Sequence, residues 1–133
     1  MKKKGVTLIE TIVSMMILTL IITILVSLVK DYKTSLKARI TKENLSRISY
    51  CIMNEIKYNY SMESVRLQAN NNIINIKNYD GILEELKYRN LFELDYGSGI
   101  EILVNNDINN SLKIRLIVSE SGDIVEREFI KWR

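Results

Sequence analysis

The amino-acid sequence predicts an α+β fold, in which a long N-terminal helix packs on a small C-terminal antiparallel sheet. Three observations lead to this prediction. No glycine or proline occurs between Val6 and Tyr60, so nothing in that stretch interrupts a helix. Residues 6–29 are almost entirely apolar. The last third of the chain instead alternates apolar and polar residues, as strands with one buried face do.

The apolar segment, residues 6–29, is long enough to cross a bilayer, for which about 20 apolar residues suffice. A secretory signal peptide would have a shorter apolar core followed by small residues, and neither precedes Lys30. Glu10 is the only charged residue in the segment. A charge inside hydrocarbon costs roughly 2.5–3.5 kcal/mol, so Glu10 requires a favourable partner.

Behind a leader of three lysines, the residues Gly5-Val6-Thr7-Leu8-Ile9-Glu10 resemble the processing site of type IV prepilins and pseudopilins. The resemblance implies that residues 1–5 are a leader peptide and that prepilin peptidase cleaves between Gly5 and Val6. It also implies that the same enzyme methylates the new amine of Val6, a position at which the family usually has Phe.

For the mature protein, the resemblance implies a pilin-like fold and assembly with other pilin or pseudopilin subunits. Glu10 would pair with the N-terminal amine of a neighbouring subunit. A cytoplasmic ATPase and a membrane platform protein would drive assembly indirectly. The implied function is a structural, minor subunit of a type IV pilus, a type II secretion pseudopilus or a competence (DNA-uptake) pseudopilus.

Glu10 also has a local interpretation. Thr7-Leu8-Ile9-Glu10 fits the S/T-x-x-E capping box, in which the glutamate accepts from a free backbone N–H. A carboxylate in the first turn also complements the helix dipole, by about 0.3–1 kcal/mol. Glu10 would cap the helix in the monomer and would form the salt bridge with a neighbouring subunit in the filament. The two roles are therefore compatible.

Basic residues flank both ends of the apolar segment. Lys2, Lys3 and Lys4 precede it, and Lys30, Lys33, Lys37 and Arg39 follow it. The positive-inside rule therefore gives no orientation. The resemblance implies a single pass with the N-terminus cytoplasmic before processing, followed by a cell-surface filament or pseudopilus. Lys30, Lys33 and Lys37 share one helix face. This face is either simply solvated or close to anionic lipid headgroups.

Residues 30–133 are expected to form the domain outside the membrane, with the helix continuing to about residue 60. Leu45, Ile48, Ile52 and Ile56 recur at three- and four-residue steps and form one apolar stripe. We expect this stripe to cover the apolar face of a sheet that lies within about residues 73–132.

Between the helix and the sheet, Asn70-Asn71-Asn72 predicts a polar break, and Ile73 to Ile76 a short strand. Asp80-Gly81 predicts a turn. Residues 81–90 favour a helical or irregular connection, with a strand starting near Leu94 as an alternative.

Three strands are predicted after this connection. Alternating patterns cover residues 100–104, 112–118 and 124–132, with a turn at 119–123 between the last two. Two successive hairpins would make a three-stranded antiparallel meander.

Composition excludes several kinds of catalytic site. The sequence has no histidine, so Ser-His-Asp and Cys-His catalysis and the commonest zinc sites are excluded. Cys51 is the single cysteine, and its apolar neighbours favour a buried small side chain over a nucleophile. The net charge of +3 is too small to indicate nucleic-acid binding. We expect no enzymatic activity, no cofactor and no metal.

Three weaker hypotheses remain. Asn105, Asp107 and Asn109 alternate oxygen-bearing side chains, but a plain turn explains one carboxylate between two strands better than a calcium site does. Trp132 and Arg133 either close the sheet edge or form an exposed contact surface. DNA is a possible partner without direct support. Binding it would require a convergence of four basic residues, Lys113, Arg115, Arg127 and Lys131.

The alternative is a protein of another class that would also carry such an apolar segment. A single-pass membrane protein could carry a binding or sensor domain that never polymerises. Such an anchor needs neither Gly5 nor Glu10, so loss of the leader would distinguish the two functions.

Overall fold

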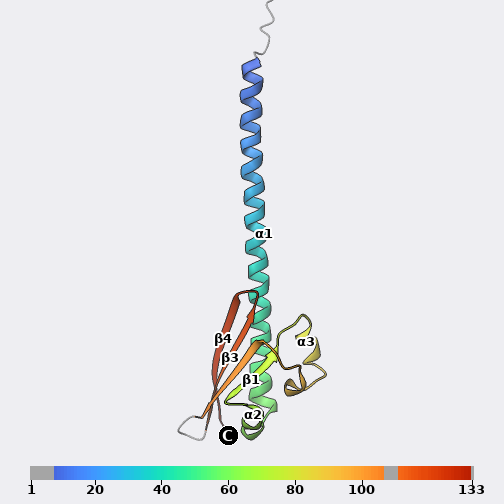
Figure 1. Ribbon diagram of the computed structural model, residues 1–133, viewed down its shortest axis with the longest axis vertical. Helices are drawn as coiled ribbons and strands as arrows, with labels where there is room; N and C mark the ends of the chain where they lie inside the picture. The colour runs from blue at the N-terminus through green and yellow to red at the C-terminus, as the bar shows by residue number, and fades with distance from the viewer. Residues whose placement is uncertain (1–7, 107–110, 133) are drawn as a thin grey trace, which may run out of the picture. The chain divides into compact units, whose positions relative to one another are not determined.

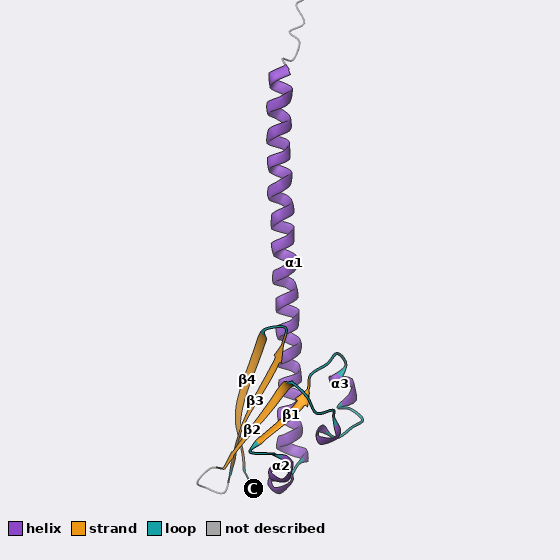
Figure 2. Ribbon diagram, viewed as in Figure 1, coloured by secondary structure: helices purple, strands orange, loops and turns teal. Residues whose placement is uncertain are grey.

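The computed structural model describes residues 8–106 and 111–132 (Figures 1 and 2). The elements, in chain order, are α1 (Leu8–Asn59), α2 (Met62–Gln68), β1 (Ile73–Lys77), α3 (Ile82–Glu85), the 3₁₀ helix η1 (Leu91–Glu93), β2 (Gly99–Asn106), β3 (Leu112–Glu120) and β4 (Asp123–Lys131). The predicted α+β class, with a long apolar N-terminal helix followed by an antiparallel sheet, is confirmed.

The chain forms two compact units, Met1–Ala38 and Arg39–Arg133, and α1 contributes residues to both. In the first unit, the described residues all belong to α1 and all are exposed. The second unit contains the remaining part of α1, all the strands and the hydrophobic core.

In the second unit, α1 packs on the sheet through the predicted stripe. Leu45, Ile52 and Ile56 are fully buried, and Ile48 is 6% exposed. Burying a side chain of this size contributes roughly 1.5–3 kcal/mol, which offsets the entropy cost of ordering the helix against the strands. The expectation that this stripe covers the sheet is therefore confirmed.

The sheet has four strands in the order β1-β2-β3-β4, and every neighbouring pair is antiparallel. The three predicted strands correspond to β2, β3 and β4, and the short strand at residues 73–77 joins them as β1. The predicted three-stranded meander is thus one strand too small. Side chains on one face fill the core: Ile74, Ile76, Ile100, Ile102, Val104, Leu112, Ile114, Leu116 and Val118.

The turns follow the residues that tolerate positive φ. Asn71 (φ 51°) and Asn72 (φ 65°) form the predicted break before β1. Ser121 (φ 51°) and Gly122 (φ 94°) form the two-residue turn between β3 and β4. Positive φ at both central residues is the geometry of a tight hairpin turn, and it fixes the register of these two strands.

The segment between β1 and β2 is largely irregular, as favoured for residues 81–90, and it contains α3 and η1. The alternative of a strand starting near Leu94 is wrong, because Leu94 follows η1 and β2 begins at Gly99. The helix α2 was not predicted. Ser61 caps it, with the Ser64 backbone N–H donating to Ser61 Oγ at 3.1 Å.

Candidate functional site

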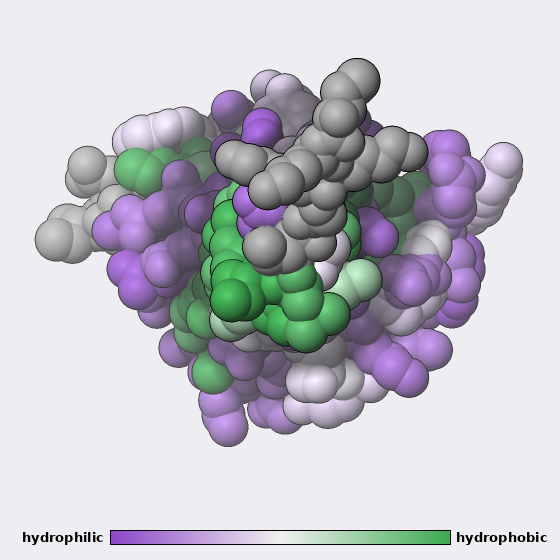
Figure 3. All heavy atoms as spheres, turned by 90° about the horizontal axis from the view of Figure 1, so that it is seen from above, coloured by the Kyte–Doolittle hydropathy of each residue, from purple (hydrophilic) through white to green (hydrophobic). Residues whose placement is uncertain are grey.

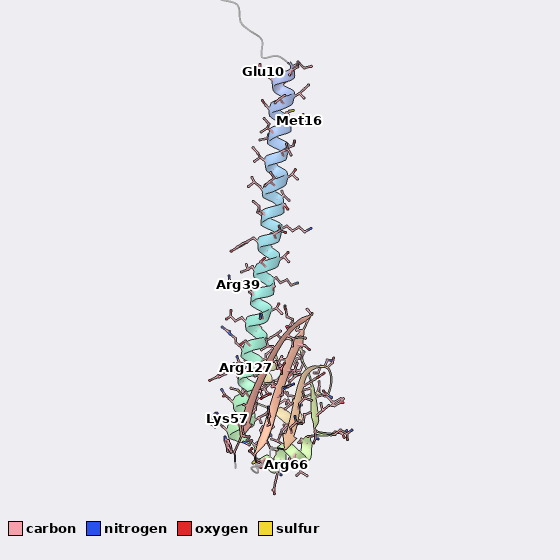
Figure 4. All side chains as sticks on the ribbon, turned by 90° about the vertical axis from the view of Figure 1, so that its left-hand side faces the viewer. Glu10, Met16, Arg39, Lys57, Arg66 and Arg127 are labelled. Carbon is pink, nitrogen blue, oxygen red and sulfur yellow. The ribbon has the colours of Figure 1, made fainter. Side chains whose placement is uncertain are left out.

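Glu10 lies in the first turn of α1, which begins at Leu8, and Figure 4 labels it at this end of the helix. The first N–H groups of a helix have no partner within the helix, so a carboxylate in this turn is favoured by roughly 0.3–1 kcal/mol. The position of Glu10 agrees with the dipole interpretation. Its pairing with a neighbouring subunit remains a prediction.

The residues predicted to be processed are Gly5 and Val6, and both lie outside the described residues. The same holds for Thr7, the expected capping partner of Glu10. Cleavage after Gly5 and methylation of Val6 therefore remain predictions.

The apolar segment presents its side chains outward on every side of α1. Each residue from Leu8 to Val29 is exposed; Leu8, for example, is 79% exposed and Met16 62%. Figure 3 shows apolar residues gathered at the centre of the view from above, and Figure 4 labels Met16. Part of α1 is long and apolar enough to cross a membrane. An apolar surface of this extent requires lipid or other protein around it.

Hydroxyl groups in this segment donate to the backbone of their own helix. Thr11 Oγ1 and Ser14 Oγ donate to the carbonyls of Leu8 and Glu10 at 2.8 and 2.7 Å. Thr19 and Thr23 make the same kind of bond at 2.8 Å each. Polar groups in hydrocarbon must find partners inside the protein, and these bonds provide them.

One protein-family model matches the chain, over residues 1–26, and it is described as the prokaryotic N-terminal methylation motif. The N-terminus carries a type IV pilin-like class III signal peptide. This signal peptide includes the first turn of α1 with Glu10 and most of the apolar segment. It implies processing by a prepilin peptidase and assembly with other pilins. No curated protein and no solved structure matches the chain.

Beyond the signal peptide, the four basic residues proposed for DNA binding do not converge. Lys113 and Arg115 lie on the outer face of the sheet, where they pair with glutamates of β4. Arg127 and Lys131 lie on the inner face of the sheet. There they are the cross-strand neighbours of the buried Leu116 and Leu112 of β3. The convergence that DNA binding would require is therefore not found, because alternate residues of a strand point to opposite faces.

Two of these basic residues instead hold β4 to α1. Arg127 Nη2 donates to Ser46 Oγ at 3.0 Å, and its guanidinium lies 5.9 Å from the ring centroid of Tyr50 (Figure 4 labels Arg127). Lys131 is 7% exposed, and its Nζ donates to the carbonyls of Ile56 and Lys57 at 2.9 and 2.8 Å. Desolvation by burial lowers the pKa of Lys131. Sequence patterns gave no signal for this contact.

Cys51 is half-buried on α1. Desolvation and the neighbouring Glu55 carboxylate raise the pKa of its thiol, which disfavours the nucleophilic thiolate. This agrees with the expectation that Cys51 is not a nucleophile.

For the suggested calcium ligands, Asn105 is exposed on β2, while Asp107 and Asn109 lie outside the described residues. Within residues 8–106 and 111–132, no three histidine, cysteine or acidic side chains are grouped to hold a metal ion.

Trp132 directly follows β4 and is 63% exposed. The expectation that it closes the sheet edge is wrong; the alternative of an exposed surface describes it better. With Tyr60 and Arg66 it lines an open groove of about 410 Å³ at the start of α2. Arg133 lies outside the described residues.

Proposed function

We propose that this protein is a minor structural subunit of a type IV pilus-like filament or pseudopilus. The observation that carries the proposal is a class III signal peptide that runs directly into a helix with an exposed apolar surface. A minor role is favoured because the unit from Arg39 onward is small and Cys51 has no partner for the disulfide loop found in many major pilins.

Processing creates a positive charge that can pair with Glu10 of a neighbouring subunit. Hydrolysis of the peptide bond between Gly5 and Val6 gives a carboxylate on the leader and an ammonium group on Val6. In methylation, the neutral amine of Val6 attacks the methyl group of a sulfonium donor, which leaves as the thioether. The resulting N-methyl amine is protonated, and so positively charged, near neutral pH. In the filament, the ammonium group of one subunit pairs with Glu10 of its neighbour. This pairing compensates both charges inside the apolar environment of the packed helices.

The proposed organisation follows from this chemistry. Residues 6–29 span the membrane in the precursor and pack against other subunits in the filament. Residues 30–133 form the domain on the outer side, with the N-terminus cytoplasmic before cleavage. The membrane stores processed subunits, and a cytoplasmic ATPase acts through a platform protein to extract them. The subunit itself carries out no reaction.

Intact mass spectrometry of the natural membrane protein tests the proposal. The expected product lacks residues 1–5 and carries one added methyl group on Val6. A single-pass binding or sensor protein that never polymerises would keep Met1–Gly5 and remain unmodified. That result would overturn the proposed function.

A bulky residue at position 5 should block processing. We expect Gly5→Leu to accumulate in the membrane at the mass of the precursor, because the peptidase must accommodate the backbone next to the cleaved bond. Lys3→Leu is the matched control, since it adds the same side chain two residues away. Normal maturation of Gly5→Leu would show that the cleavage site is assigned wrongly.

A further inference from the structure

Lys30, Lys33 and Lys37 form a continuous basic face on the first unit, called here the lysine face. At 100° per residue, these side chains lie within about 60° of one another around the helix axis. All three are exposed. They begin directly after Val29, where the apolar segment ends.

No acidic residue lies at ion-pair spacing from the lysine face. The residues three and four positions before and after each of these lysines include no acid. Lys30–Lys33 and Lys33–Lys37 are instead like-charge neighbours, which disfavour a solvated helix. Among the ion pairs of the described residues, none involves these lysines.

Three basic residues of the second unit, one in α1 and two just after α3, do have acidic partners. Arg47 pairs with Glu43 at 2.9 Å, Lys87 with Glu84 at 2.7 Å and Arg89 with Glu85 at 3.1 Å. Each pair is formed by residues three or four positions apart. Lack of an ion pair alone does not distinguish the lysine face, since Lys57 and Arg66 also form none with the described residues. Its distinguishing feature is three like charges on one helix face directly after the apolar segment, an arrangement that suits an external anionic partner.

With residues 6–29 across the membrane, as proposed above, the lysine face would begin where the hydrocarbon ends and the headgroups begin. Lys30 to Lys37 covers about 10 Å of helix, comparable with the thickness of a headgroup layer. Tyr32 is 69% exposed in the same turns. Tyrosine is enriched at membrane–water interfaces, where its ring and hydroxyl meet suitable surroundings.

We propose that the lysine face binds the phosphate groups of anionic phospholipids in the leaflet from which α1 leaves the membrane. This rests on the membrane insertion that is part of the proposed function. The ammonium groups act as compact charges for the phosphates, and the apolar turns before Lys30 fix their height. Binding would hold the subunit at a defined depth until it is extracted.

Site-resolved acetylation of the full-length chain tests this proposal. The chain is placed in nanodiscs of phosphatidylcholine alone or with 30% phosphatidylglycerol, and an amine-reactive acetyl reagent reaches both sides of each disc. Peptide mass spectrometry then gives the acetylation rate of each lysine. Lys57, Lys77 and Lys87, which are exposed in the second unit, are the internal controls.

The expected result is slower acetylation of Lys30, Lys33 and Lys37 in the anionic discs, by roughly fivefold if each contact has its usual strength. The three control lysines should react equally in both discs. The protection should disappear in 0.5 M salt, because screening weakens the contact.

Variants give a second measurement, the enrichment of phosphatidylglycerol around the protein in discs of mixed lipid. Changing Lys30, Lys33 and Lys37 together to Gln should lower this enrichment, whereas changing them to Arg should preserve it. The same Gln substitutions at Lys57, Lys77 and Lys87 change the net charge equally and should have no effect.

Equal acetylation in both kinds of disc would overturn the lipid contact while leaving the proposed function intact. Protection that depends on protein concentration but not on lipid charge would also overturn it, and would indicate a second copy of the chain. Failure of the chain to enter discs at all would overturn both the contact and the membrane insertion.

Discussion

Glu10 is a single carboxylate in an exposed apolar helix surface, so its effect on assembly can be isolated by mutation. We expect Glu10→Ala to insert and be cleaved normally, because cleavage depends on Gly5, but to be incorporated into filaments at least about tenfold less. A tenfold loss corresponds to about 1.4 kcal/mol. This is less than the cost of leaving the neighbouring subunit's ammonium group without a counter-charge in hydrocarbon. Immunoblots of sheared filaments and of membranes measure the two steps separately.

Glu10→Asp is the matched control for this prediction. It keeps the charge on a shorter side chain and should retain part of the incorporation. Full incorporation of Glu10→Ala would contradict the pairing role, and loss of its cleavage would place Glu10 in peptidase recognition instead.

Tyr79 should make the stability of the second unit sensitive to alkaline pH. Its hydroxyl donates to Glu85 Oε2 at 2.7 Å, and desolvation together with this carboxylate raises its pKa to about 12. The folded state therefore keeps a proton that the unfolded chain releases near pH 10, so stability is lost as the pH rises from about 10 to 12.

Urea unfolding of wild type and Tyr79→Phe at several pH values measures this effect. Phe cannot ionise, so the variant should lose less stability than wild type between pH 10 and 12. Tyr60, whose pKa is also raised, and Lys131, whose pKa is lowered, contribute to both curves and cancel in the comparison. Parallel curves would contradict the assignment to Tyr79.

The candidate site was selected from the sequence at the level of single residues, because its chemistry depends on residue identity at fixed spacing, and the roles of these residues remain predictions. Gly5, Val6 and Glu10 are adjacent in the chain, so no tertiary contact was needed to select them. Lys131 is different. Its partners are the carbonyls of Ile56 and Lys57, which are far away in the sequence. Because every residue has a backbone carbonyl, the side-chain sequence does not indicate which carbonyls Lys131 will contact.

At the scale of elements, the contact of Lys131 joins the end of β4 to the last turn of α1. Helix carbonyls at this end lack partners within the helix, and a cation there also complements the dipole. We expect Lys131→Met to lower the free energy of unfolding by about 1.5–3 kcal/mol, because two buried carbonyls lose a charged donor. Urea titration of the detergent-solubilised chain, followed by tyrosine and tryptophan fluorescence, measures the change.

Lys113→Met is the matched control, because Lys113 makes an exposed pair with Glu128 on the outer face of the same hairpin. Such surface pairs contribute about 0–1 kcal/mol. Equal losses in the two variants would contradict a special role for the contact between β4 and α1.

Prediction of the elements succeeded where one face was uniformly apolar. In α1 the stripe from Leu45 to Ile56, and in β3 the alternation from Leu112 to Val118, each identify the buried face. In β4, apolar and charged residues occur on both faces, since Ile124 and Ile130 point outward while Arg127 and Lys131 point inward. The strand was predicted correctly, but no periodicity could assign its faces.

The short helix α2 was missed for a related reason. Its seven residues contribute only Val65 to the buried core, so it has no apolar period of its own. Ser61, a favoured N-cap residue three positions before Ser64, was the available signal.

At the scale of the whole molecule, the buried hydrophobic residues among those the structure describes all lie beyond Ala38. We expect a chain that starts at Arg39 to fold without the apolar segment and to remain soluble. A domain of this size should unfold cooperatively in urea, with a free energy of unfolding of about 5–10 kcal/mol. Circular dichroism shows whether the fragment is folded, and urea titration gives the cooperativity and the free energy of unfolding. A gradual transition without a folded baseline would contradict the prediction.

The hydroxyl protons of Thr11, Ser14, Thr19 and Thr23 are already committed to carbonyls of their own helix. These four side chains therefore have no proton left to offer a neighbouring helix, although their oxygens can still accept a hydrogen bond. Contacts made by this part of α1 then depend mainly on shape, on Glu10 and on Ser27, whose hydroxyl makes no such bond within the described part of the chain. Such a surface discriminates poorly between helices of similar bulk. We therefore expect recognition of one particular sibling subunit to depend mainly on residues that follow Ala38.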